Sequence, residues 1–394
     1  MKRRIGKPLF MAAVLALTAL SVGSAGLLAA AVMIILLLIV SAVSVRWAAS
    51  TLTVRCALAD TTLTREQSTE LRATVRHRCP LPVAPVGLFV SDLPGYPERL
   101  ISLKGRRGSD SYTMGLMAAH VGVFRMGVRS CIVSDPFGFF TVERETPEAT
   151  AVLTILPRTF DVEKLKFAPA DTGLGTMATA REDASDPMDV RAWQRGDSLK
   201  KVHWKLSARR RTLLTRRFEE PALPEVLVLL DCTRPERGIY EGTVADALLE
   251  TAASVFAVQE KENCELRLPL WGSHPTELTL RMGLPLALER LAQVDFSVTE
   301  GFDRELIDAA RRVRQIGAAV VITSRLTGRL LDPLIMLRRQ GPAVRLYLVT
   351  VNPDREDWQP LIARLQRVGI EVCSVMPPGG NTPPFDPESY FRNR

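Results

Sequence analysis

Three side chains suited to nucleophilic chemistry lie in one short stretch of the chain: Asp197, His203 and Ser207. A histidine can act as a general base toward a serine hydroxyl, and a carboxylate can orient the imidazole. Lys205 lies between the histidine and the serine and adds an amine. The stretch therefore raises the hypothesis of an enzyme of unknown reaction centred on Asp197, His203 and Lys205.

The element that must position these side chains argues against this hypothesis. Gly196 and Asp197 are typical of a turn and a helix N-cap, because an aspartate carboxylate accepts hydrogen bonds from the amides of a first helical turn. We therefore expect a helix from about Ser198, and its apolar residues recur at helical spacing: Leu199, Val202 and Leu206. His203 and Ser207 then lie one turn apart on one helix, whereas a nucleophile needs a strained or exposed turn beside an oriented base. The sequence predicts no catalytic residue here.

Residues 191–219 resemble the signature of domain-of-unknown-function family 58, which carries a similar series of Gly-Asp, His-Trp-Lys and Ser-Ala-Arg. The resemblance extends upstream to 122–127, 134–140 and 156–158. It implies signature or interaction residues: Arg191, Gly196, Asp197, His203, Trp204, Lys205, Ser207 and Arg209. Members of this family tend to occur alongside MoxR-type AAA+ ATPases, so the resemblance implies a protein partner of that kind.

A second resemblance concerns the apolar run Val226–Leu230, which ends in Asp-Cys-Thr-Arg-Pro. This end looks like the opening of a von Willebrand factor A-type domain, in which an Asp-x-Ser-x-Ser loop supplies oxygen ligands to a divalent cation. The resemblance implies a Mg²⁺ site in which Asp231 and Thr233 match the pattern. Pro235 departs from it, because its side chain offers no oxygen.

The end of a later strand bears on the same site. Thr323 and Ser324 add hydroxyl oxygens, but the neighbouring Arg325 opposes a bound cation. We therefore expect a degenerate metal site and no cofactor. The domain can retain a partner-binding role without the ion.

The chain is basic, with 51 Lys and Arg against 43 Asp and Glu. Much of the excess lies near the signature: Lys200, Lys201, Lys205, Arg209, Arg210, Arg211, Arg216 and Arg217. Such a cluster favours one of three roles, which are binding of nucleic acid phosphates, binding of an anionic membrane surface or protein, and pairing with acidic residues of the chain itself. We expect no specific nucleic acid partner. The sequence also contains no Gly-Lys-Ser/Thr run, so it lacks a phosphate-binding loop for nucleotide hydrolysis.

No charged residue occurs between Pro8 and Val45. A membrane-crossing helix needs about 20 apolar residues, with about 17 as the lower limit. We therefore expect two transmembrane helices, at about 8–23 and 27–45. A cleaved signal peptide is the alternative, but the second apolar run argues against it.

Positive charge on both sides of this block predicts that both ends face the cytoplasm. The expected location is therefore the cell membrane, with several passes and cytoplasmic soluble domains. Six scattered cysteines without a Cys-x-x-Cys pair agree with reduced thiols. A single span would instead place the soluble part outside.

The remaining pattern predicts a membrane-anchored multidomain protein. Short alternating strands over 47–160 favour a β-sandwich-like domain, and strands alternating with helices over 223–376 favour a doubly wound α/β domain of the A type. The segment 161–222 is the signature linker, and 377–394 is a flexible tail. We expect a non-catalytic scaffold or adaptor that docks partner proteins through the α/β domain.

Overall fold

A computed structural model describes residues 2–3, 6–81, 83–91, 99–103, 108–147, 149–165, 189–194, 202–217, 225–262, 264–271, 275–312 and 316–377. Gly196, Asp197 and nearly all of the predicted tail lie outside the described residues. The chain divides into two compact units. The main part of the first is Met1–Arg158, and the main parts of the second are Thr159–Arg290 and Val294–Thr382.

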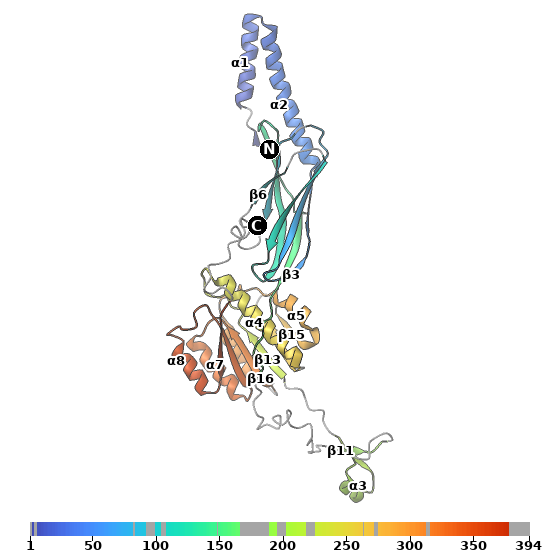
Figure 1. Ribbon diagram of the computed structural model, residues 1–394, viewed down its shortest axis with the longest axis vertical. Helices are drawn as coiled ribbons and strands as arrows, with labels where there is room; N and C mark the ends of the chain where they lie inside the picture. The colour runs from blue at the N-terminus through green and yellow to red at the C-terminus, as the bar shows by residue number, and fades with distance from the viewer. Residues whose placement is uncertain are drawn as a thin grey trace. The chain divides into compact units, whose positions relative to one another are not determined.

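Two apolar helices, α1 (Gly6–Val22) and α2 (Ala25–Thr51), begin the first unit and lie side by side (Figure 1). Gly23 between them has a φ of +69°, a left-handed conformation that favours glycine. One helix, α2, is long and apolar enough to cross a membrane, whereas α1 is a shorter apolar helix. The prediction of an N-terminal membrane helix is confirmed at this level, and two passes remain a prediction.

α2 continues past its predicted end at Val45. The reason is tertiary packing, because Val45, Ala48 and Leu52 are buried in the core of the β structure that follows. The guanidinium of Arg144 donates hydrogen bonds to the carbonyl oxygens of Ala49, at 2.8 Å, and Leu52, at 3.2 Å. It thereby satisfies carbonyls that a helix C-terminus leaves without an intrahelical partner.

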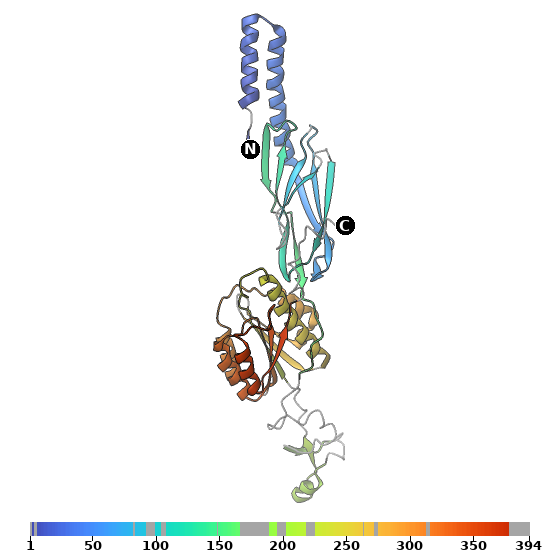
Figure 2. The same ribbon diagram turned by 60° about the vertical axis from the view of Figure 1, so that its left-hand side comes forward.

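The rest of the first unit consists of two sheets (Figure 2). The three-stranded sheet is antiparallel, with the order β2 (Thr53–Leu58), β4 (Ser68–His77) and β7 (Gly108–Met117). The seven-stranded sheet has the order β1 (Lys2–Arg3), β9 (Phe140–Glu145), β8 (Gly122–Ser134), β10 (Thr150–Leu156) and β3 (Thr62–Thr64), and β5 (Val86–Ser91) joins β8 to β6 (Arg99–Leu103).

Both sheets contribute to one apolar core. Leu71 and Val75 come from β4 of the smaller sheet, and Leu88, Val133 and Leu153 come from the larger one. Burial alternates along β4, as the period of two in a half-buried strand requires. The strand-rich character predicted for this region is confirmed.

The second unit is built on a six-stranded sheet, in which all neighbours are parallel except the antiparallel pair of β14 and β15. Its order is β15 (Thr276–Thr279), β14 (Glu265–Leu270), β13 (Glu225–Leu230), β16 (Ile316–Thr323), β17 (Ala343–Val349) and β18 (Glu371–Val375). The helices are α4 (Glu241–Glu262), α5 (Leu284–Leu291), α6 (Phe302–Arg312), α7 (Gly328–Arg339) and α8 (Gln359–Arg367), with a 3₁₀ turn over Leu280–Met282.

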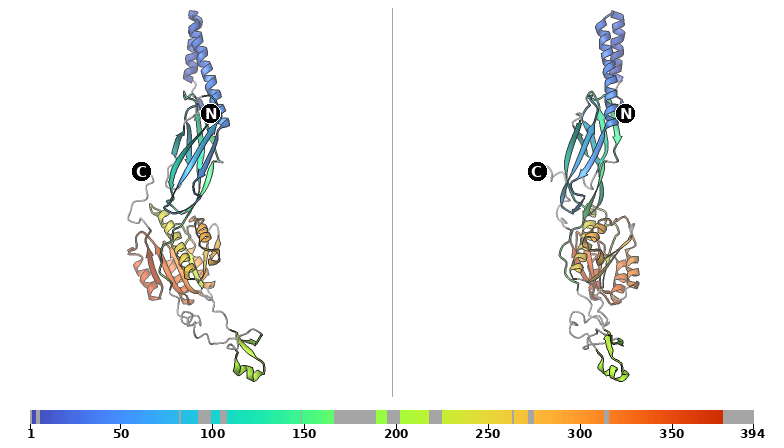
Figure 3. Two further views of the ribbon diagram at one scale, coloured as in Figure 1. Left: turned by 45° about the vertical axis from the view of Figure 1, so that its right-hand side comes forward. Right: turned by 90° about the vertical axis from the view of Figure 1, so that its right-hand side faces the viewer.

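Helices flank this sheet on both faces (Figure 3). Leu227 and Leu229 of β13 pack in one cluster with Leu306 of α6, Leu334 of α7 and Leu365 of α8. The intervening residues of β13 are also buried and face the other way, where α4 contacts β13, β14, β16 and β17. The predicted alternation of strands and helices over 223–376 is confirmed.

The signature region forms a small separate element. β11 (Asp189–Ala192) pairs antiparallel with β12 (Leu214–Arg217), and the helix α3 (Trp204–Arg210) lies between them in the sequence. The prediction of a helix from Ser198 is wrong, because Val202 and His203 precede the helix. Val202 is buried as expected, but it precedes the helix instead of lying on a helical stripe.

Candidate functional site

Two signature side chains hold the fold of their own element. His203 is the N-cap of α3, and its Nδ1 accepts a hydrogen bond from the backbone N–H of Leu206 at 3.3 Å. The hydroxyl of Ser207 is buried and accepts a hydrogen bond from the backbone N–H of Leu214 at 2.9 Å. The backbone N–H of His203 donates to the carbonyl of the same Leu214 at 2.8 Å. These bonds tie α3 to β12.

The remaining signature side chains that the structure describes point to solvent. Trp204 is 60% exposed, and Lys205 and Arg209 are exposed as well. Arg191 pairs with Thr215 through the β11–β12 ladder. In the described part of the signature, His203 therefore caps a helix and Ser207 contacts a strand. These residues do not form a pair of nucleophile and base.

The carboxyl ends of β13 and β16 form a second candidate site. β13 is followed in the chain by β14 on one side and then by β16 on the other, so the chain direction across the sheet reverses here. Ligands of open parallel sheets bind at such a reversal, beyond the carboxyl ends of the strands. Asp231 and Thr233 follow β13, and Thr323 ends β16, which brings together the residues that the sequence predicted at this edge.

The carboxylate of Asp231 lies at the centre of this edge and is 2% exposed. Its Oδ1 accepts hydrogen bonds from the backbone N–H of Thr233, at 2.9 Å, and from the hydroxyl of Thr233, at 2.6 Å. Its Oδ2 accepts one from the hydroxyl of Thr323 at 2.6 Å. Burial raises the pKa of Asp231 above its ordinary value, and these hydrogen bonds and the charge of Arg325 offset only part of that effect.

Arg325 adds a fixed positive charge to the same cluster. Its guanidinium donates a hydrogen bond to the hydroxyl of Thr233, and its backbone N–H donates to the hydroxyl of Thr323 at 3.1 Å. The two threonine hydroxyls are therefore held by Arg325 and Asp231. These residues do not fit a Mg²⁺ ion, because the oxygens it would use are engaged and a cation already contacts them.

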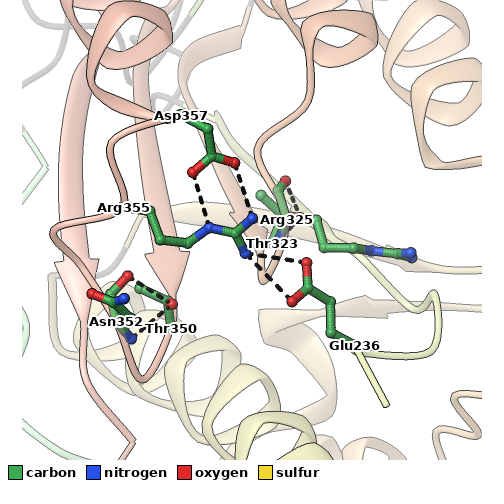
Figure 4. A network of polar contacts seen from close by, with 7 residues as sticks. All are labelled: Glu236, Thr323, Arg325, Thr350, Asn352, Arg355 and Asp357. Carbon is green, nitrogen blue, oxygen red and sulfur yellow. Dashed lines mark hydrogen bonds and ion pairs between the residues drawn. The ribbon is translucent and has the colours of Figure 1, made fainter. Parts of the chain in front are cut away.

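A second arginine, Arg355, lies at the same edge of the sheet (Figure 4). The sequence did not indicate it as a site residue. Arg355, after β17, forms a bidentate pair with Asp357 at 2.9 and 3.1 Å and reaches Glu236, after β13, at 3.2 Å. Its guanidinium also lies 4.5 Å from the ring centroid of Trp358. The signal for these residues was their position just beyond the carboxyl ends of two parallel strands, β13 and β17, which lie on either side of β16.

The two arginines differ in how their charge is balanced. Arg355 is paired with two exposed carboxylates, whereas the described contacts of Arg325 are with hydroxyls, and its acidic neighbour Asp231 is buried behind Thr233. Arg325 is half-buried, so part of its side chain still faces solvent. The edge can therefore offer one oriented guanidinium to an acidic group.

Buried thiols add no nucleophile to the described part of the chain. Burial raises the pKa of Cys131 to about 11 and that of Cys232 to about 12, so neither forms a thiolate at neutral pH. All six cysteines are free thiols.

Residues 189–279 match the family model described as "Protein of unknown function DUF58". The match spans the signature element and the second unit from β13 to β15. It confirms, over these residues, the family that the sequence resembles.

Three solved structures show distant similarity to parts of the chain. The CARDB domain of a Pyrococcus furiosus protein, in a crystal structure with di-metal ions, is 16% identical, with a TM-score of 0.19, over 26% of this chain and 91% of that one. A solution structure of that CARDB domain is 19% identical, with a TM-score of 0.20, over 27% and 94%. Cwp6 from Clostridium difficile is 9% identical, with a TM-score of 0.18, over 83% and 37%. No curated protein sequence matches the chain.

Proposed function

We propose that this protein is a non-catalytic, membrane-anchored scaffold that docks partner proteins through its α/β domain. The domain is of the von Willebrand factor A type in this proposal, and the partner is a MoxR-type AAA+ ATPase that acts in assembly or maturation of other proteins. The observation that carries the proposal is the edge beyond β13 and β16, where Arg325 is held by Thr233 and pairs with no exposed carboxylate among the described residues.

An arginine so placed suits recognition of an acidic side chain. Its planar guanidinium has five N–H donors, and a bidentate contact with a carboxylate uses two of them. Because Thr233 and Asp231 fix one side of the group, less side-chain entropy is lost on binding. The neighbouring Arg355 is neutralised by Glu236 and Asp357, which leaves Arg325 as the site for the partner.

The anchor in this proposal consists of both N-terminal helices, with the soluble units in the cytoplasm. The support is the length of α2, the apolar character of α1 and the positive charge on both sides of the block. Proteolysis of inside-out membrane vesicles tests this arrangement. Cytoplasmic units are digested there, and protection of the region beyond Arg46 would contradict the placement.

A pull-down of the tagged full-length protein from detergent-solubilised membranes tests the docking role. We expect an AAA+ ATPase, identified by mass spectrometry, to co-purify with the wild type and not with Arg325→Gln. Arg329→Gln is the matched control, because this arginine lies four residues farther along the chain in the first turn of α7, is exposed and is outside the cluster. Equal recovery with Arg325→Gln and the wild type would reject this site, and recovery of no ATPase from the wild type would reject the partner.

A further inference from the structure

An apolar groove of about 310 Å³ lies between α2 and the loop that follows β8, within the first unit. Its volume is at the lower end of the range of about 300–1,000 Å³ seen in small-ligand sites. None of the described residues that line the groove is charged, and its main walls are Met33, Leu36, Leu37, Val40, Pro136 and Phe137. The α2 wall belongs to the exposed apolar surface of the helix, where Met33 and Leu36 are 65% and 61% exposed.

The loop wall is held in one conformation. The carboxylate of Asp135 accepts hydrogen bonds from the backbone N–H groups of Phe137, at 3.0 Å, and Phe140, at 2.6 Å. Gly138 donates to the carbonyl of Asp135 at 3.1 Å and has a φ of +72°, which favours glycine. The ring of Phe137 stacks on Phe139 at 5.7 Å, and Phe139 packs against the core. Phe137 is thus presented rigidly, although it is 58% exposed.

The charges on the two helices place this groove at the boundary of an apolar layer. α1 and α2 lie side by side from the turn at Gly23, and both rise by about 1.5 Å per residue, so Lys7 is level with about Val40. The next charge on α2 is Arg46, about 9 Å farther along the helix. Long basic side chains extend toward the headgroups, so the boundary crosses α2 between Val40 and Arg46.

We propose that this groove holds one acyl chain of a membrane phospholipid, with Phe137 inserted into the bilayer beside it. The groove is continuous with the helix surface that faces lipid, and aromatic residues favour the interface at which the loop lies. The loop therefore acts as a second membrane contact and fixes the β structure against the bilayer. This inference rests on anchoring through α2, which is part of the proposed function.

Site-specific photocrosslinking tests the inference. The full-length chain carries p-benzoylphenylalanine in place of Phe137 and is reconstituted into vesicles of dioleoylphosphatidylcholine and dioleoylphosphatidylglycerol. Two other positions, replaced in the same way in separate variants, serve as controls: Ile39 as the positive control and Val152 as the negative control. Ile39 lies at the same height on α2 outside the groove walls, and Val152 is 48% exposed but pairs with Arg125, about 30 Å along β8 from Ser134.

We expect a lipid adduct at position 137 with a yield close to that at position 39 and about tenfold above that at position 152, because an apolar phase favours a phenylalanine side chain by at least this factor. Mass spectrometry after lipase treatment should place the adduct on an acyl chain. Adduct at 39 without adduct at 137 would reject the groove site and leave the anchor intact. Adduct at neither position would reject the anchor itself. Crosslinking of position 137 to a protein segment or to a headgroup would also reject the acyl chain.

Discussion

The guanidinium of Arg325 donates a hydrogen bond to the hydroxyl of Thr233, one of the two residues for which the sequence resemblance implied a divalent cation. Thr233 in turn donates to Asp231 at 2.6 Å. The positive charge at this edge of the sheet is therefore part of the chain. A charge of this kind does not depend on metal supply, and chelators cannot remove it.

Addition of Mg²⁺ should leave the thermal stability of the wild-type protein unchanged. An ion bound at about 100 times its Kd would add about 2.7 kcal/mol to the free energy of unfolding. Differential scanning calorimetry with EDTA and with excess Mg²⁺ measures the difference in Tm. A rise in Tm with Mg²⁺ that disappears in Asp231→Asn would show that the cluster holds a cation after all.

Replacement of Asp231 by Asn should not destabilise the second unit at neutral pH. The native state raises the pKa of Asp231, so its contribution to stability is present below the unfolded pKa of about 3.9 and is lost as pH rises through the folded pKa. The Asn amide can donate to Thr323, whose hydroxyl then donates to the carbonyl of Arg325 at 3.1 Å.

Thermal unfolding from pH 4 to pH 8 measures this effect. We expect the wild type to lose stability relative to Asp231→Asn as the pH rises, while the exposed Asp308→Asn follows the wild type. A difference between wild type and Asp231→Asn that does not change with pH would contradict the raised pKa.

Loss of Arg144 should loosen the end of α2. Arg144→Ala removes two hydrogen bonds from a charged donor to the carbonyls of Ala49 and Leu52. Because Arg144 is exposed, we expect a cost of only about 1.4 kcal/mol in local stability, which corresponds to about tenfold faster amide exchange near Leu52. Hydrogen–deuterium exchange of the peptide over 47–58 tests this, with the exposed Arg125→Ala as the control. Unchanged exchange would show that the cap does not hold the helix.

Ser207→Ala should destabilise the signature element. The variant leaves the backbone N–H of Leu214 without its acceptor, which costs about 1–3 kcal/mol for a buried group. Limited proteolysis of 202–217 should become faster, while the exposed Lys205→Ala remains like the wild type. If both variants had the same proteolysis rate as the wild type, Ser207 would not have the structural role that its contact indicates.

Most of the regular elements could be predicted from apolar patterns. The continuous apolar run Val226–Leu230, which forms most of β13, and the alternation of strands and helices over 223–376 followed from the sequence, because burial imposes those patterns. The helix from Ser198 was wrong because Val202 is buried ahead of the first residue of α3, although it has helical spacing from Leu206.

The candidate site could be predicted only in part. Asp231, Thr233 and Arg325 were visible as residues at strand ends, and the conflict between a cation and Arg325 followed from charge. Arg355 and its partners were not, because no local pattern shows that the segments after β13 and β17 meet. The role of Ser207 likewise depended on its contact with Leu214, and the role of His203 depended on where α3 begins.

The sequence by itself determined the apolar N-terminal block, the strand-rich region, the alternating strands and helices, and the family signature, because each is written in local composition and period. Only the tertiary structure decided that α2 extends to Thr51, that His203 and Ser207 brace α3, and that Arg325 meets the hydroxyl of Thr233. These outcomes depend on contacts between residues far apart in the chain or on packing of a local segment against other elements. Local propensity does not encode such contacts.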